Sequence, residues 1–275
     1  MSQTATIYSK VGALRVELPS PEVEVVPGVQ WGAVDAFPTP AYWVYQVVHR
    51  RISGGPPQYK LGRTLAEEVG ACLLGGHGIP AAVGMAAYER LRSLGAFSGE
   101  PPSREQLLDW LIEPVTVGGR EIRYRFATQK SRYLAEILTA MPSVPAAASG
   151  RALRDWLRAL PGIGYKTASW VARNWLNADD VAILDIHILR FGQAIGLFPT
   201  SLTVERHYLE LESLFLSLCS CMDVRPSELD AVVWHEMATS PLTVKNLVGE
   251  LKEKSVSPRR LRRPTNVETQ LVLAV

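Results

Sequence analysis

The sequence has few cysteines, and this limits the metal chemistry that it can support. Its 275 residues include three cysteines, Cys72, Cys219 and Cys221. A cysteine-ligated iron–sulfur cluster needs four, so we expect none. Cys219 and Cys221 lie close in sequence but have no matching pair of cysteines or histidines nearby. We therefore predict free thiols, no metal site and no cofactor.

Long apolar runs and export signals are also missing. No stretch reaches the ~20 consecutive apolar residues of a membrane span. Residues 1–12 lack the basic and then apolar layout of a signal peptide. The composition, 47% hydrophobic and 20% charged, is that of an ordinary globular protein. We expect a cytoplasmic protein with no membrane partner.

Neither sign of charge dominates, because the net charge is only +2. The cations are nevertheless clustered: residues 120–132 hold five against Glu121, residues 151–173 hold five against Asp155, and residues 245–263 hold seven against two glutamates. One such run is usually a solvated face. Three of them, one around the motif described next, favour a nucleic-acid partner.

Residues 151–177 have the pattern of two helices joined by a tight glycine turn. Apolar side chains recur at helical spacing over residues 151–160, and the first helix ends at Pro161-Gly162. Gly162 and Gly164 permit positive φ and close approach of another backbone, while Ile163 fills the gap between the helices. The backbone N–H groups of Gly162, Gly164 and Tyr165 would then point outward, where they can bind a phosphate.

Two charged residues lie near this turn, in places where a purely structural design would avoid them. Lys166 follows the turn on a helix that is otherwise small and apolar. Asp185 ends the apolar run of residues 181–184, so its carboxylate should be partly desolvated. A lysine and an aspartate that converge beside a phosphate-binding turn suggest chemistry on a nucleic-acid backbone.

These residues also carry a family resemblance. Leu160-Pro161-Gly162-Ile163-Gly164-Tyr165-Lys166, followed by Ile183-Leu184-Asp185-Ile186-His187-Ile188-Leu189-Arg190, resembles the signature of helix-hairpin-helix DNA glycosylases with lyase activity. That family includes endonuclease III and the 8-oxoguanine DNA glycosylases. Residues 164–169 and 182–190 look most like the small archaeal and bacterial 8-oxoguanine enzymes that lack an N-terminal β domain. Weaker similarity extends over about residues 60–240.

The resemblance implies a bifunctional enzyme that acts on double-stranded DNA, and we expect it to be a monomer. It would flip a damaged nucleotide out of the duplex and excise its base. Asp185 would stabilise positive charge at C1′, and Lys166 would capture that carbon as a Schiff base, followed by β-elimination. The residues expected to bind the DNA backbone are Gly162, Ile163, Gly164, Tyr165, His187 and Arg190. His77, in a turn with three glycines, is the candidate wedge for the vacated stack. The candidates for stacking on the flipped base are Trp31, Phe37, Trp43 and Trp234.

Several of these assignments have a plainer alternative. Each of the four aromatic residues could instead be a core residue. His77 could be an exposed turn residue, and His187 could be a structural histidine. Lys166 could face solvent, as in hairpin modules that only bind DNA, although the matching Asp185 pattern argues against this.

The expected fold is all-α, with two helical lobes and a DNA-binding cleft between them. Residues 1–56 form an N-terminal segment with short extended stretches that packs on the C-terminal lobe, residues 181–257. Residues 57–180 form the central lobe, and residues 258–275 a basic and apolar tail. Helices are expected over residues 40–52, 61–74, 80–94, 103–111, 125–141, 204–217 and 228–237, and a loop over residues 115–120.

Two functional alternatives stay open. One is a non-catalytic DNA-binding protein. The other keeps the chemistry and changes the base to an oxidised pyrimidine or a hypermodified phage base, which would make the enzyme part of a phage defence.

Overall fold

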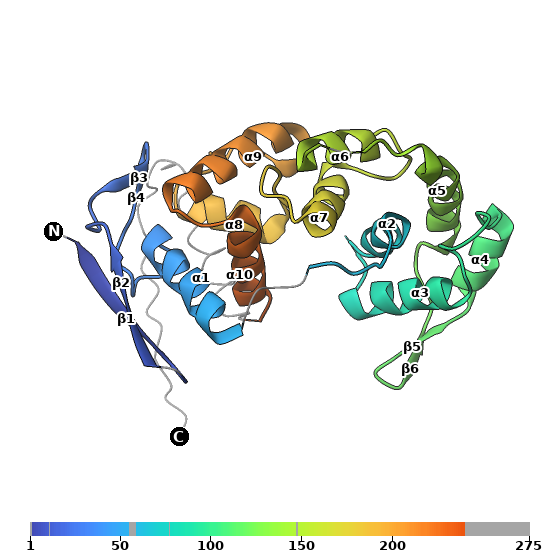
Figure 1. Cartoon of the computed structure of the whole chain (residues 1–275), viewed down its shortest axis with the longest axis horizontal. Helices are drawn as coiled ribbons and strands as arrows, with labels where there is room; N and C mark the ends of the chain where they lie inside the picture. Colours follow the sequence, from blue (N-terminus) through green and yellow to red (C-terminus); the bar gives the residue numbers. More distant parts are fainter. Residues whose placement is uncertain (1, 11, 55–58, 77, 147, 240–275) are drawn as a thin grey trace, which may run out of the picture.

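The structure is a computed structural model that describes residues 2–10, 12–54, 59–76, 78–146 and 148–239. Two helical lobes lie side by side, and the chain passes between them twice, between α1 and α2 and between α7 and α8 (Figure 1). The helices are α1 (Pro40–Gly54), α2 (Leu65–Leu74), α3 (Ala81–Ser93), α4 (Arg104–Ile112), α5 (Ala127–Ala140), α6 (Gly150–Leu157), α7 (Tyr165–Leu176), α8 (Ile186–Ala194), α9 (Val204–Cys221) and α10 (Pro226–Thr239). The predicted all-α class is confirmed.

The fold also contains short strands. The strands are β1 (Gln3–Ser9), β2 (Gly12–Leu18), β3 (Glu24–Val26), β4 (Val29–Gln30), β5 (Val115–Val117) and β6 (Arg120–Ile122). They pair in sequence order as three antiparallel two-stranded sheets. β1 and β2 form the longest hairpin, at the outer edge of the first lobe (Figure 1).

The first lobe brings the two ends of the described chain together. Its core joins residues of β2, β3, β4 and α1 to residues of α8, α9 and α10. Trp43 of α1 is fully buried there, and its ring packs edge-on against Phe191 of α8 at 5.6 Å between centroids. The N-terminal segment therefore packs against the C-terminal helices.

The second lobe has its own core, built from α2 to α7. Glu68 of α2 is completely buried in it and is fully used as an acceptor. One carboxylate oxygen accepts from the N–H groups of Leu61 and Gly62, at 2.7 and 2.8 Å, and the other accepts from Asn174 Nδ2 of α7 at 2.7 Å. This carboxylate ties the connecting segment to α2 and α7, which form the wall next to the first lobe.

Two local predictions were wrong. The helix expected from residue 61 begins at Leu65, because Thr64 is its N-cap and residues 61 and 62 donate to Glu68 instead. Residues 115–120, expected as a loop, form the hairpin β5–β6. Gly118 and Gly119 both have positive φ, +57° and +74°, which is what a two-residue hairpin turn requires.

The capping box is a local expectation that is met. The capping box of Ser103 and Gln106 is present at the start of α4, as predicted. The three cysteines are free thiols, with Cys72 and Cys219 buried and Cys221 exposed. In the described part of the chain, no helix combines the length and apolarity needed to cross a membrane. Of the predicted lobe limits, residues 57 and 257 lie outside the described residues, as does the tail.

Candidate active site

The predicted hairpin is present between α6 and α7. Ser149 caps α6 by accepting from the N–H of Ala152 at 3.1 Å, and the chain turns through Gly162, whose φ is +74°. A Cβ at Gly162 would lie only 2.1 Å from Cδ2 of Tyr133, so α5 packs directly on the turn. Ile163 is buried under it, as expected.

The N-terminus of α7 is open. Gly164 is the N-cap, and no side chain of the described residues caps this helix end. Gly162 and Gly164 are both exposed, and nothing lies within 4 Å of where a Cβ of Gly164 would be. The free N–H groups and the positive end of the helix dipole therefore face solvent, an arrangement that binds a phosphate oxygen.

Tyr165 is held between two partners. On one side its ring stacks on the ring of Tyr208 of α9, with centroids 5.1 Å apart and planes 15° from parallel. On the other side the guanidinium carbon of Arg158 lies 3.4 Å from the ring centroid. This sandwich fixes the first turn of α7, and with it the start of the Lys166 side chain.

Lys166 lines a cavity of about 260 Å³ between α2, α5 and α7. The other residues that line this cavity are Gly75, Gly76, Ile79, Phe126, Gln129, Lys130, Thr167 and Trp170. The lining contains two lysines and no carboxylate. Lys166 makes no salt bridge or side-chain hydrogen bond with any described residue. Its amine is therefore available to a ligand.

Asp185 is the N-cap of α8. Its Oδ1 accepts from the N–H groups of His187 at 2.8 Å and Ile188 at 3.0 Å. These bonds hold the carboxylate at one orientation and leave Oδ2 without a partner among the described residues. An anchored carboxylate with one free oxygen suits electrostatic stabilisation of a developing cation.

Two side chains of α9 anchor the run that leads to Asp185. The hydroxyl of Tyr208 donates to the carbonyl of Ala182 at 2.6 Å and accepts from the N–H of Leu184 at 3.2 Å. Glu212 accepts from the N–H of Ala182 at 2.9 Å and forms a buried salt bridge with Arg154 of α6. The apolar run is thus fixed to the same helix that holds Tyr165.

A second aspartate, Asp230, lies near Lys166 and Asp185. Asp230 of α10 is buried, and its Oδ2 lies 3.6 Å from Nη2 of the buried Arg173. Burial raises the pKa of Asp230 to about 6; Asp185 adds to the shift, and Arg173 and Lys166 oppose it. Asp230 is therefore close enough to both Lys166 and Asp185 to interact with each of them electrostatically, although the three residues belong to α10, α7 and the N-cap of α8.

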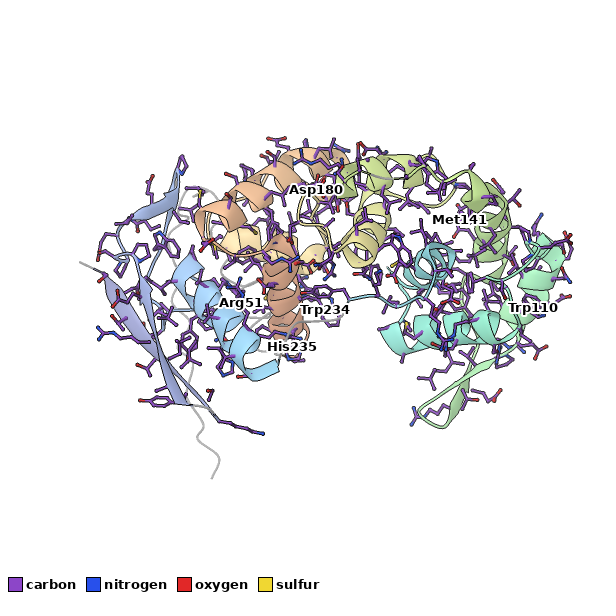
Figure 2. The ribbon with its side chains drawn as sticks, in the orientation of Figure 1. Arg51, Trp110, Met141, Asp180, Trp234 and His235 are labelled. Atoms are coloured by element: carbon purple, nitrogen blue, oxygen red, sulfur yellow. The ribbon has the colours of Figure 1, made fainter. Side chains whose placement is uncertain are left out.

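The four candidate aromatic residues differ in exposure and in position. Trp43 is fully buried and Trp31 is 7% exposed; both belong to the first core, and neither lines the cavity of Lys166. Phe37 is 37% exposed but packs on Tyr42 and Trp43. Trp234 is 48% exposed on α10, one turn beyond Asp230 (Figure 2). Only Trp234 combines exposure with a position near the charged residues.

Three candidate residues remain: His187, Arg190 and His77. His187 is half-buried and its Nδ1 has no hydrogen-bond partner within the described part of the chain. Arg190 is half-buried one turn further along α8. His77 lies outside the described residues, between Gly76 and Gly78, which have φ values of +99° and +76°.

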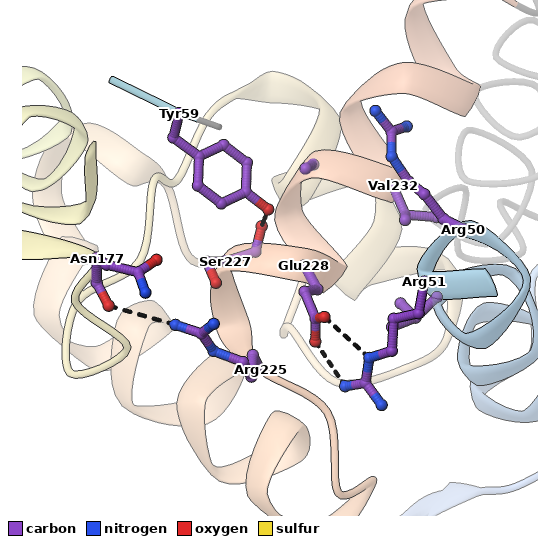
Figure 3. A pocket seen from close by; sticks show the side chains of 10 residues that line it. Arg50, Arg51, Tyr59, Asn177, Arg225, Ser227, Glu228 and Val232 are labelled. Carbon is purple, nitrogen blue, oxygen red and sulfur yellow. Dashed lines mark hydrogen bonds and ion pairs between the residues drawn. The ribbon is translucent and has the colours of Figure 1, made fainter. Parts of the chain in front are cut away.

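A larger cavity, of about 330 Å³, lies elsewhere, between α1, α10 and Tyr59 (Figure 3). Most of its charge is already paired. Arg51 makes a bidentate contact with Glu228, and Arg225 pairs with Asp179 at 2.6 Å. Neither Lys166 nor Asp185 lines it. Size alone therefore does not identify the site of chemistry.

Sequence reasoning missed Lys130, Trp170, Asp230 and Tyr208. Lys130 is one of five cations in the run over residues 120–132, and nothing in the sequence separates it from the other four. A carboxylate directly before the apolar run Ala231-Val232-Val233 was the available signal for Asp230. Nothing local marks Tyr208, because its importance comes from contacts with segments 24 to 43 residues away.

A two-lobed helical fold with an open hairpin, a lysine in a cavity beside it and an anchored aspartate defines a helix-hairpin-helix DNA glycosylase. The chain belongs to the 8-oxoguanine DNA glycosylase family, because residues 63–224 match the model of that family. The match leaves β1 to β4, α1 and α10 outside it. None of the curated proteins matches the chain.

Solved structures share the fold. One is the 8-oxoguanine DNA glycosylase of Methanocaldococcus jannaschii, with a TM-score of 0.54 and 23% identity, covering 73% of this chain and 94% of that chain. A second is the 8-oxoguanine glycosylase/lyase of the same organism in complex with a 15mer DNA containing 8-oxoguanine, with a TM-score of 0.52 and 22% identity, covering 72% and 98%. A third is the 8-oxoguanine DNA glycosylase of Thermotoga maritima, with a TM-score of 0.53 and 23% identity, covering 70% and 95%.

Proposed function

We propose that the chain is a bifunctional DNA glycosylase and abasic-site lyase that excises 8-oxoguanine from double-stranded DNA through a Schiff base at Lys166. The observation that carries the proposal is the setting of Lys166. It lies in a cavity whose lining contains no carboxylate, one residue after the sandwiched Tyr165, and it interacts electrostatically with Asp230, which also interacts with Asp185.

The hairpin and the charged residues have separate tasks in this mechanism. The N–H groups at Gly164 and the start of α7 hold a backbone phosphate and do not read sequence. The target nucleotide must leave the base stack, because its C1′ is unreachable inside the duplex. Holding the backbone at the hairpin sets the sugar beside Lys166.

In this mechanism, Asp185 and Lys166 carry out base excision. As the glycosidic bond breaks, its electron pair leaves with the base and positive charge develops at C1′. The Asp185 carboxylate stabilises this charge electrostatically. The neutral amine of Lys166 forms a bond from Nζ to C1′, and after loss of its protons and opening of the sugar ring the product is an imine.

The lyase step uses the imine as an electron sink. A proton leaves C2′ and passes to water, and the C–H electron pair forms a double bond between C2′ and C3′. The bond between C3′ and its oxygen breaks, and that electron pair leaves with the 3′ phosphate. Hydrolysis of the imine then frees Lys166, so the cycle needs neither a metal nor a redox cofactor.

The choice of 8-oxoguanine rests on the family and on the named substrates of the similar structures. Two residues of α10 are suited to contact a flipped base. Trp234 offers an exposed ring for stacking, and Asp230, one turn before it, offers a carboxylate whose pKa burial raises to about 6. Trp234 and Asp230 both lie on α10, which follows the residues matched by the family model. Base identity is therefore the part of the proposal that most needs a direct test.

The test is a single-turnover assay on duplexes that each carry one defined lesion: 8-oxoguanine, an oxidised pyrimidine or a hypermodified cytosine. Base release, strand cleavage and borohydride trapping are measured for the parent, Lys166→Gln, Asp185→Asn and a control, Lys10→Gln, at an exposed turn. We expect 8-oxoguanine release, trapping of the parent and the control, and no trapping of Lys166→Gln. If Lys166→Gln cleaves as fast as the parent, the Schiff-base mechanism is wrong. If only another base is released, the 8-oxoguanine assignment is wrong and the reaction class stands.

A further inference from the structure

A second lysine shares the cavity of Lys166. Lys130 lies on α5, in its first turn, and it lines the cavity together with Gln129 of the same helix and Phe126, the N-cap of that helix. Lys166, Thr167 and Trp170 of α7 also line it. The two lysines thus reach one cavity from two helices, and α5 also contacts the hairpin, where Tyr133 lies against Gly162.

Lys130 has no counter-ion in the described part of the chain. It appears in none of the salt bridges, and its side chain makes no hydrogen bond with a described residue. Its neighbour Gln129 is committed to Tyr133, to whose hydroxyl it donates at 3.0 Å. The side chain is half-buried, and burial lowers the pKa of Lys130. An unpaired, partly desolvated cation is costly unless a ligand supplies the negative charge.

Several arginines of the molecule differ from Lys130, because they are paired with carboxylates. Arg154 and Arg173 are buried with carboxylates beside them, and Arg51 and Arg225 pair with carboxylates at the larger cavity. The fold therefore neutralises the cations that it uses structurally. Lys130 is left open toward the cavity in which the proposed nucleophile lies.

We propose that Lys130 is a substrate-binding residue whose ammonium holds a DNA phosphate directly flanking the flipped nucleotide. The inference rests on the proposed function, because Lys166 must bond to C1′ of that nucleotide. A cavity that admits C1′ to Lys166 brings the phosphates on the 5′ and 3′ sides of the same sugar to its walls. The anion that Lys130 meets is then one of these two phosphates.

The contact would complement the hairpin. The open N-terminus of α7 holds one phosphate through neutral N–H groups, and Lys130 holds another through a full charge. Two held phosphates fix both the position and the rotation of the sugar between them. If the phosphate is the 3′ one, Lys130 also stabilises the group that leaves in β-elimination.

The test measures binding and needs no chemistry. The ligands are three duplexes with a tetrahydrofuran abasic analogue: one with natural phosphates, one with a neutral methylphosphonate on the 5′ side of the analogue and one with it on the 3′ side. The proteins are the parent, Lys130→Met, Lys130→Gln and Lys130→Arg. Arg132→Met is the matched control, because it removes an exposed cation from the same helix outside the cavity.

With natural phosphates, we expect Lys130→Met and Lys130→Gln to bind about tenfold more weakly than the parent, the usual effect of losing a charge-assisted hydrogen bond. The slope of log affinity against log salt should fall by about 0.9, the value for one phosphate contact. On one of the methylphosphonate duplexes the loss should vanish, and that duplex identifies the phosphate. Lys130→Arg should keep most of the affinity, and Arg132→Met should lose the same factor on all three duplexes.

Two results would overturn the proposal: no loss for Lys130→Met, or an equal loss on all three duplexes. Both neutral variants are compared with the parent by thermal unfolding, so that a folding defect is separated from a binding defect. The analogue cannot form a Schiff base, so this outcome is independent of the trapping assay. A parent that shows the phosphate coupling but cannot be trapped would refute the lyase and leave the role of Lys130 intact.

Discussion

The ring of Tyr208 stacks on the ring of Tyr165 at 5.1 Å between centroids, and the hydroxyl of Tyr208 bonds the backbone that leads to Asp185. One side chain of α9 therefore contacts both halves of the site. It supports the first turn of α7, which carries Lys166, and it pairs the carbonyl of Ala182 and the N–H of Leu184. The relative position of the lysine and the aspartate depends on this residue.

Replacement of Tyr208 by phenylalanine should separate these two contacts. Tyr208→Phe keeps the ring stack and leaves two buried backbone groups unpaired, so we expect a loss of about 1–3 kcal/mol in the free energy of unfolding. Urea denaturation measures this loss. Base excision should slow because the Asp185 segment loses its anchor, while affinity for an abasic-analogue duplex should stay within a factor of two or so. Unchanged stability would show that water replaces the hydroxyl and that the anchor is dispensable.

Asp185 has a structural and a chemical task, and two substitutions distinguish them. Asparagine can still accept from His187 and Ile188, so Asp185→Asn should cost only a few tenths of a kcal/mol, whereas Asp185→Ala loses the cap and should cost about 1 kcal/mol. Both remove the negative charge near C1′, and both should slow base excision by roughly 10²–10³-fold. Thermal unfolding and single-turnover rates are measured on the same samples. A rate for Asp185→Asn close to that of the parent would assign the aspartate to capping alone.

The features that could be predicted from the sequence are those whose causes are local. The hairpin follows from the Pro161-Gly162 break and from Gly164, and the start of α4 follows from the Ser103 capping box. Apolar spacing predicts the helices to within a few residues at most ends. These determinants lie within one or two turns of the residue that they control, so a single sequence contains them.

The features that could not be predicted depend on where distant segments meet. Asp230 and Lys130 are 64 and 36 residues from Lys166, and only the tertiary fold brings α10 and α5 into the neighbourhood of Lys166. Trp43 shows the converse, because an aromatic residue in a plausible helix looks the same in sequence whether it lines a pocket or, as here, fills a core. Composition carries no information on which of these occurs.

The two glycines of the hairpin should respond differently to alanine. A Cβ at Gly162 would clash with the Tyr133 ring at 2.1 Å on a backbone of φ +74°, so Gly162→Ala should destabilise the fold by about 1–3 kcal/mol. Gly164 has open space and a φ of −89°, so Gly164→Ala should fold normally. Its methyl group would instead stand between the N–H groups of α7 and a phosphate, and DNA affinity should fall. Urea denaturation and a binding titration test the pair; normal affinity for Gly164→Ala would exclude this turn from the DNA contact.

Asp230 should make stability depend on pH in a defined direction. Its pKa is raised from 3.8 to about 6 in the folded protein, so the native state binds its proton more tightly than the unfolded state does. The resulting contribution is fully present below about pH 4 and is lost as the pH rises through about 6; a shift of this size corresponds to on the order of 3 kcal/mol. Asp230→Asn cannot titrate, so the parent should lose stability relative to this variant between about pH 4 and pH 7. Urea denaturation of both proteins across this range measures the difference. A constant difference, or one that grows in favour of the parent as the pH rises, would mean that the ion pair with Arg173 outweighs burial and that the carboxylate is charged throughout.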